Sequence, residues 1–135
     1  TIFEKLMAGE LPCAKVYEDA HVFAFMDAGQ VNPGHVIVAT RKPYETLLDA
    51  DETAAAALFA AVHRIARAVD KAFAPQGITI LQANKAAGWQ TVPHLHAHVL
   101  PRHANDGGTQ PAPVDGDRLE GVAKDGSSGE CAFCC

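Results

Sequence analysis

Between residues 94 and 99, histidine alternates with an apolar residue three times in succession, which strongly restricts the local structure. Successive side chains of a β-strand point to opposite faces of a sheet, so a period of two separates the two residue classes. We therefore predict a strand over 92–100 that buries its apolar residues in a core. The three imidazoles share its other face: His94, His96 and His98.

The remaining periodicity predicts one short helix, four further strands and one long helix. Apolar spacing is helical over 2–9, and strand-forming residues occupy 15–18, 21–26, 35–40 and 78–82. A long helix follows Asp49 or Asp51, either of which can cap it, and ends before Pro75. Short turns between the strands favour an α+β fold: an antiparallel β-sheet of about five strands with one long helix and a short N-terminal helix.

Composition indicates a single folded unit followed by a segment of different character. A chain of 135 residues with 48% hydrophobic residues is long enough for one sizeable core. Residues 104–135 hold six of the eleven glycines and few large apolar groups. We predict a domain over 1–103 and a Gly-rich C-terminal loop or tail over 104–135.

Charge and hydropathy exclude several classes of function. The formal net charge of −5 lacks the basic footprint of a general nucleic-acid binder, so no stable nucleic-acid binding is expected. No run of eighteen apolar residues is present, which argues against a membrane span. The first residues do not resemble a signal peptide, and the four cysteines suit reduced thiols, so the expected location is the cytoplasm.

Three interpretations of the alternating histidines remain open on chemistry alone. They are ordinary surface residues, ligands of a zinc ion, or the machinery of a phosphate reaction. On a flat strand His94 and His98 are about 13 Å apart, so one zinc ion could not bind all three without a sharp bend. A neutral imidazole is a good nucleophile near pH 7, and its neighbours can hold phosphate oxygens. Phosphate chemistry is therefore preferred, with zinc second.

The segment His94-Leu95-His96-Ala97-His98-Val99-Leu100 resembles the signature of the histidine triad (HIT) superfamily of nucleotide hydrolases and transferases. The similarity covers roughly residues 2–103 and includes three upstream segments in the family's order: 16–19, 24–27 and 32–35. Two positions depart from the family pattern. Pro43 stands where many relatives have a histidine, which weakens a zinc site, and Trp89 stands where many have glycine.

The resemblance implies a two-step reaction at the α-phosphate of a nucleotide. His96 would attack the phosphorus to form a nucleotidyl-histidine, which water would then hydrolyse. His98 would bind an α-phosphate oxygen, and His94 would orient and polarise the site. Asp27 matches the acidic residue that binds the ribose hydroxyls. The polar positions for phosphate or the leaving group are matched by Asn84, Gln90 and Thr91.

The same resemblance favours a hydrolase over a transferase, because His98 stands where uridylyltransferase relatives have glutamine. The expected substrate is a nucleoside polyphosphate or phosphoramidate, with purine preferred and the choice of bond left open. No cofactor is expected to be required, although a divalent metal can accompany the substrate. A homodimer is expected. The alternative is a non-catalytic nucleotide-binding or protein-interaction member of the family.

Overall fold

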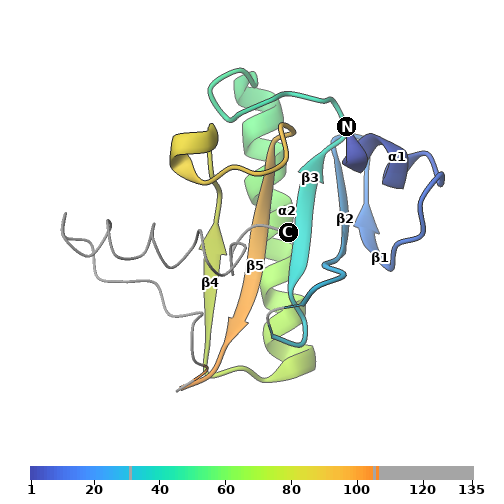
Figure 1. Ribbon diagram of the computed structural model, residues 1–135. Helices are drawn as coiled ribbons and strands as arrows, with labels where there is room; N and C mark the ends of the chain where they lie inside the picture. The colour runs from blue at the N-terminus through green and yellow to red at the C-terminus, as the bar shows by residue number, and fades with distance from the viewer. Residues whose placement is uncertain (31, 105, 107–135) are drawn as a thin grey trace.

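The protein forms an antiparallel sheet crossed by one long helix, as a computed structural model shows for residues 1–30, 32–104 and 106 (Figure 1). The strand order is β1-β2-β3-β5-β4. The strands are β1 (Lys15–Glu18), β2 (Val22–Met26), β3 (Val36–Thr40), β4 (Gly77–Leu81) and β5 (His96–Arg102). The helices are α1 (Ile2–Met7), α2 (Glu52–Phe73) and a short 3₁₀ turn, η1 (Ala86–Gly88). The predicted α+β class and five strands are therefore confirmed.

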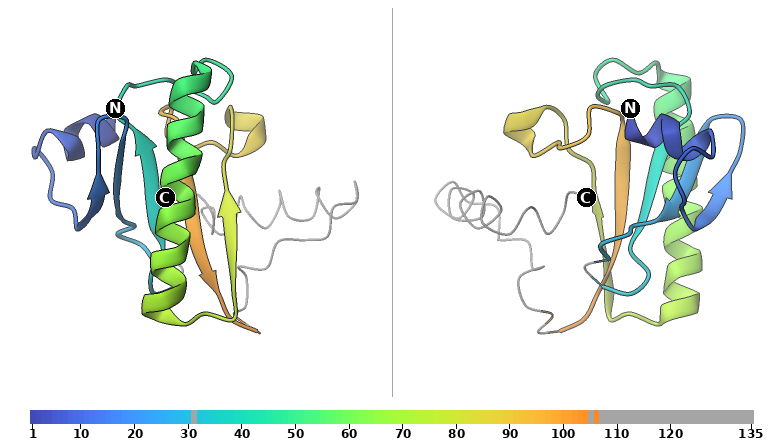
Figure 2. Two further views of the ribbon diagram at one scale, coloured as in Figure 1. Left: turned by 180° about the vertical axis from the view of Figure 1, so that it is seen from behind. Right: turned by 45° about the vertical axis from the view of Figure 1, so that its right-hand side comes forward.

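The two faces of the sheet carry different layers, which the period-two pattern of the strands separates. Helix α2 crosses one face, where alternate residues of β2, β3 and β5 pack against its apolar stripe (Figure 2). Helix α1 contributes Phe3 to a smaller cluster with alternate residues of β2 and β3, including Phe25 and Ile37. In β5, Ala97 packs in the α2 layer, so its neighbours His96 and His98 face the α1 side.

Helix α2 begins and ends where the sequence predicts. Asp51 is the N-cap, and its carboxylate accepts a 2.7 Å hydrogen bond from the Ala54 amide. Its buried residues recur with helical periodicity along one face: Leu58, Val62, Ile65 and Val69. The helix ends at Phe73, and Ala74 follows in the left-handed conformation with φ 46°. Pro75, which cannot continue the helix, comes next.

Strand β5 differs most from the sequence prediction, which placed it at 92–100. The strand begins at His96, so the prediction that His94 lies within it is wrong. The chain bends at 92–94, where the His94 amide donates to the Val92 carbonyl at 2.8 Å. At its other end β5 continues through Pro101 to Arg102, because its last residues pair with the first residues of β4. The other strands and both helices begin and end within two residues of their predicted limits.

Two further sequence predictions concern the C-terminal tail and the absence of a membrane span. The predicted tail over 104–135 lies outside the described residues, apart from Ala104 and Asp106. Among the described residues, no helix combines the length and the apolar character that crossing a bilayer requires.

Candidate active site

The backbone just before β5 holds the His96 ring in one tautomer. Its Nδ1 lies 2.6 Å from the His94 carbonyl oxygen. A carbonyl oxygen can only accept, so Nδ1 carries the proton and donates it. The proton-free nitrogen is then Nε2, whose lone pair can act as a nucleophile. A backbone carbonyl therefore holds the protonated nitrogen of His96 and leaves the other nitrogen free.

His94 has a partner at each ring nitrogen. Its Nε2 donates to the Thr40 carbonyl at 2.6 Å, so Nδ1 accepts the hydroxyl proton of Thr1, also at 2.6 Å. Although His94 precedes the strand, its ring lies in the same cluster as His96. The Phe3 ring packs edge-on against both imidazoles, with centroid distances of 5.4 Å to His94 and 4.9 Å to His96. Helix α1 therefore contacts the first two members of the triad.

His98 begins a buried polar chain that runs across the sheet to Asp27. Its Nδ1 forms a 2.9 Å hydrogen bond with Nε2 of His35, the residue that precedes β3. On the other side of that ring, Nδ1 of His35 lies 3.1 Å from Oδ2 of Asp27, a contact of ion-pair length. All three side chains are buried. Asp27 therefore faces a histidine as well as the surface cavity described below.

Burial keeps the three triad imidazoles neutral. It lowers the pKa of His94 and His96 below the usual value of 6.5, because the charged form loses hydration. The pKa of His98 falls to about 3, first through burial and then through repulsion by the neighbouring His96 and His35. A neutral His96 keeps its lone pair near pH 7, as attack on phosphorus requires.

An apolar cavity of about 650 Å³ lies on the α1 side of the sheet beside the triad. Phe3, which packs on His94 and His96, forms one wall, and Asp27, which contacts His35, forms another. Most of the remaining lining is apolar, including Leu6, Phe25 and Ile37. The cavity is large enough for a nucleoside-sized ligand, and Asp27 is the one predicted site residue in its lining, whereas the triad histidines lie behind Phe3 and outside the lining.

The other predicted phosphate contacts lie on the segment between β4 and β5, where their side chains hold a neighbouring loop. Oδ1 of Asn84 accepts the Leu47 amide at 2.8 Å. Nε2 of Gln90 donates to the carbonyl oxygens of Glu45 and Val92, at 2.6 and 3.0 Å. Thr91 is exposed. The contacts of Asn84 and Gln90 join the loop over 41–51 to the segment that leads into β5. A phosphate contact by Asn84, Gln90 or Thr91 stays a prediction.

Trp89 occupies a backbone position that favours glycine, as its departure from the family pattern suggests. Its φ is 74°, in the left-handed region, and Lys85 at the other end of η1 has φ 66°. Only glycine adopts this region without steric cost, so a side chain of this size is strained here. The backbone here thus has the left-handed turn geometry that glycine adopts most readily, with tryptophan at the position.

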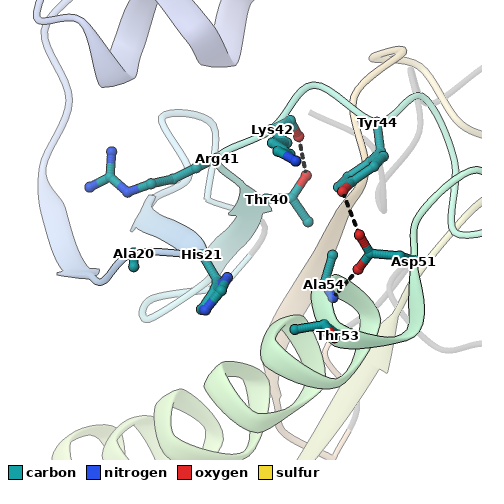
Figure 3. A pocket seen from close by; sticks show the side chains of 9 residues that line it. All are labelled: Ala20, His21, Thr40, Arg41, Lys42, Tyr44, Asp51, Thr53 and Ala54. Carbon is teal, nitrogen blue, oxygen red and sulfur yellow. Dashed lines mark hydrogen bonds between the residues drawn. The ribbon is translucent and has the colours of Figure 1, made fainter.

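A second cavity, of about 270 Å³, lies between the end of β3 and the start of α2 (Figure 3). Within it the Tyr44 hydroxyl donates to the Asp51 carboxylate, the same group that caps α2. The Tyr44 carbonyl accepts the Leu95 amide at 2.7 Å, so this loop links the α2 N-terminus to the triad strand. None of the predicted site residues line this cavity, and Arg41 points away from it.

The zinc alternative stays a prediction, and the described residues show how the histidines are engaged. Within residues 1–30, 32–104 and 106, no group of three or more His, Cys, Asp or Glu side chains is arranged to hold a metal ion. His94 already uses both ring nitrogens in hydrogen bonds, and Nδ1 of His96 donates to a carbonyl. Among these two histidines, His94 therefore has no free lone pair for a metal, whereas His96 keeps the lone pair of Nε2.

Two residues of this site were not identified from the sequence. His35 lies at the start of the predicted strand over 35–40 and was given no role there, yet its ring joins His98 to Asp27. Its signal is a histidine that opens an otherwise apolar strand, directly after the turn residues Asn32-Pro33-Gly34. Thr1 gave no signal as a site residue, because its contact with His94 spans 93 residues of sequence.

Comparison with known proteins gives consistent matches. The family described as HIT domain matches residues 8–105. "Protein hit" of Bacillus subtilis is 41% identical over 107 residues, covering 79% of this chain and 74% of that protein. A crystal structure of a Hit-like protein from Bartonella henselae is 44% identical, with a TM-score of 0.75 and 91% of each chain covered.

Two further relatives carry names of enzymes. Adenosine 5'-monophosphoramidase hnt1 of Schizosaccharomyces pombe is 30% identical over 101 residues, covering 75% of this chain and 73% of that protein. Adenylylsulfatase HINT3 of Arabidopsis thaliana is 32% identical over 105 residues, covering 78% of this chain and 53% of that protein. This chain thus spans about half the length of the Arabidopsis relative.

Proposed function

The chain belongs to the HIT domain family, and from that premise we propose that it is a hydrolase that cleaves nucleotides at the α-phosphate through a covalent intermediate on His96. The observation that carries the proposal is the tautomer of His96, whose Nδ1 proton is donated to the His94 carbonyl. This arrangement leaves Nε2 as a neutral nucleophile inside a buried cluster of imidazoles. The enzyme names of the two relatives support a hydrolase as well.

The first chemical step forms a bond between Nε2 of His96 and the α-phosphorus. The bond from phosphorus to the leaving oxygen or nitrogen breaks, and the leaving group departs with the electron pair, an amine taking up a proton from solvent as it leaves. His96 then carries a positive charge, which the carbonyl oxygen of His94 stabilises through the Nδ1 proton. Water attacks the phosphorus in the second step and releases a proton to solvent, the P–N bond breaks, and the lone pair returns to Nε2.

His98 and Asp27 are proposed to hold the nucleotide on either side of the reacting phosphorus. His98 lies next to His96, with ring centroids 5.0 Å apart, and can contact an oxygen of the α-phosphate. Asp27 forms part of the wall of the large cavity, where its carboxylate can accept hydrogen bonds from the ribose hydroxyls. The apolar lining fits the flat face of a base, and a purine would bury more area there than a pyrimidine.

The leaving group is proposed to be either a polyphosphate chain or an amine. The relative named as a monophosphoramidase favours a P–N bond, and the relative named as an adenylylsulfatase shows that the family includes other leaving groups. Asn84, Gln90 and Thr91 are proposed to contact phosphate or this group. For Gln90 this requires its amide to exchange at least one of its two carbonyl partners for the substrate.

We also propose that the protein acts in the cytoplasm as a homodimer. Strand β4 lies at one edge of the sheet, where its backbone can pair with another strand. Ile80 on this edge is 41% exposed, and Phe59 on α2 is also 41% exposed. A second copy that covered such side chains would remove apolar surface from water.

Turnover of an adenosine phosphoramidate and a diadenosine polyphosphate tests the proposal directly. Replacing His96 by alanine should lower turnover on the order of 10⁴-fold or more while nucleotide binding survives. The matched control is His63→Ala, because His63 is an exposed histidine on α2 and should leave turnover unchanged. After alkaline quenching, the unaltered protein should carry an acid-labile adduct on His96.

Different results would distinguish the alternatives. Label on His94 or His98, or a His96→Ala variant that keeps more than about a tenth of the turnover, would contradict the proposed nucleophile. Nucleotide binding without turnover of either substrate would favour the non-catalytic alternative.

A further inference from the structure

Thr1, the N-cap residue of helix α1, contacts the triad at His94. The hydroxyl of Thr1 donates to Nδ1 of His94 at 2.6 Å and accepts the Glu4 amide at 3.4 Å. The same hydroxyl is therefore both the N-cap of the helix and a partner of the first histidine. A hydroxyl can do both, because it has one donor and two acceptor lone pairs.

The second nitrogen of that histidine is anchored to a different element. Nε2 of His94 donates to the Thr40 carbonyl at the end of β3, so the ring is clamped between α1 and the sheet. His94 precedes β5 and lies in a bend, where the strand ladder does not fix its backbone. The ring contacts take over part of that role. The backbone carbonyl of His94 in turn accepts the Nδ1 proton of His96 at 2.6 Å.

We propose that Thr1 is a positioning residue for the reaction proposed above: it fixes the ring of His94, and through the His94 carbonyl it fixes the orientation of His96. The chain of contacts is continuous, from hydroxyl to imidazole and from carbonyl to imidazole, with each separation 2.6 Å. Loss of the hydroxyl leaves Nδ1 of a buried histidine without its donor, and residue 94 can then rotate. The carbonyl that selects the tautomer of His96 moves with it.

Thr1 has two roles, capping helix α1 and contacting His94, and variants of the capping box can test them separately. Thr1 and Glu4 cap the helix reciprocally, so loss of either residue weakens the helix terminus. Of the two side chains, only the Thr1 hydroxyl hydrogen-bonds to His94, while the Glu4 carboxylate acts on that ring through its charge alone. Glu4→Ala is therefore the matched control, since it removes a partner from the cap and keeps the hydroxyl. Thr1→Ser keeps the hydroxyl, whereas Thr1→Val has almost the same shape and lacks it.

The experiment compares these three variants with the unaltered protein by two measurements. The first is the ¹⁵N chemical shift of the histidine side chains, which reports the tautomer and hydrogen bonding of His94 and His96. The second is kcat and KM for an adenosine phosphoramidate. Thr1→Val should shift the His94 Nδ1 signal towards that of an unbonded acceptor and lower kcat about three- to tenfold with KM unchanged. Thr1→Ser and Glu4→Ala should retain both the signal and kcat.

Two results would overturn the inference: an unchanged His94 signal in Thr1→Val, or an equal loss of kcat in Glu4→Ala. The second would show that the effect arises from helix stability alone. Failure of the proposed function is distinguishable, because it would appear as no turnover in the unaltered protein. The ¹⁵N signals would still decide whether Thr1 holds His94.

Discussion

At the scale of single residues, the site depends on imidazoles that are buried and neutral. Proteins seldom bury several titratable groups together unless each has partners, and here backbone carbonyls, a hydroxyl and a carboxylate supply them. The same burial makes the folded state unable to accept protons that the unfolded chain binds readily. The cluster should therefore make stability depend on pH.

His98 gives the clearest expectation, because its pKa falls from 6.5 to about 3 on folding. Above about pH 6.5 neither state is protonated at His98, and its burial adds no pH dependence. Below that value the unfolded chain binds a proton that the folded protein does not. Stability should fall as the pH is lowered, by up to ~1.4 kcal/mol per pH unit for this one site.

Urea unfolding between neutral pH and about pH 4 measures this dependence. His98→Asn should give a flatter curve than the unaltered protein, because the variant lacks the titrating ring. His63→Asn is the control, as the exposed ring of His63 lies outside the cluster. Equal slopes for His98→Asn and the unaltered protein would contradict the expectation.

The individual site residues were predictable to different extents. The alternation of His96 and His98 places both on one face, and this follows from strand geometry alone. His35 is different, because its position beside His98 depends on β3 pairing with β5, where Ile37 lies opposite His98. A single sequence carries no information on which strands pair or in which register. Long-range contacts such as Thr1 with His94 are absent from the sequence pattern for the same reason.

At the scale of elements, local sequence determined most helix and strand limits, and tertiary contacts determined the rest. Helix α2 has a capping aspartate, an apolar stripe and a terminating proline, so its limits could be predicted. Strand β5 has Pro93 near its predicted start, and its neighbour Leu95 bonds to Tyr44 in the loop over 41–51. The Leu95 carbonyl still accepts the Thr40 amide of β3 at 3.1 Å, so only its amide is taken by the loop in place of a strand partner.

The C-terminus of α2 offers a test at this scale. Ala74 has φ 46° and ψ 50°, a conformation that costs an alanine energy and a glycine almost none. Ala74→Gly should therefore raise the free energy of unfolding by about 0.5–1 kcal/mol. Ala60→Gly, at an exposed position inside the same helix, should lower it by about 1 kcal/mol. Chemical unfolding of both variants checks the opposite signs, and destabilisation by both would contradict the role assigned to Ala74.

At the scale of the whole molecule, the fold class followed from the sequence, whereas the strand order did not. In the order β1-β2-β3-β5-β4, strand β5 lies between β3 and β4. Segments that are distant in sequence therefore lie close to its ends. One such segment contains Asn32, whose side chain donates to the Pro101 carbonyl at 2.7 Å. Pro101 itself pairs with Ile78 of β4 and lies beyond the last residue that pairs with β3, so its missing amide proton costs no bond to that strand.

Contacts around Asp106 carry the described fold past residue 103, the limit predicted from composition. Its carboxylate accepts hydrogen bonds from the Arg102 guanidinium, at 2.8 and 3.0 Å, and from the Asn32 side chain at 3.1 Å. The Arg102 and Asp106 side chains are only 11% and 5% exposed, so solvent screens this pair little. We therefore expect the stable fold to extend through Asp106, a few residues past the limit at 103 predicted from composition.

Two truncated chains test this limit. A chain that ends at Asp106 should unfold with the same free energy as the full chain. One that ends at His103 should be less stable by about 1.5–3 kcal/mol, because it loses hydrogen bonds between charged groups and leaves Arg102 partly buried without its partner. Asp106→Ala in the full chain should reproduce most of that loss, which separates the carboxylate from the residues removed with it. Equal stability of the two truncated chains would show that Asp106 adds nothing to the fold, and the limit would then return to 103.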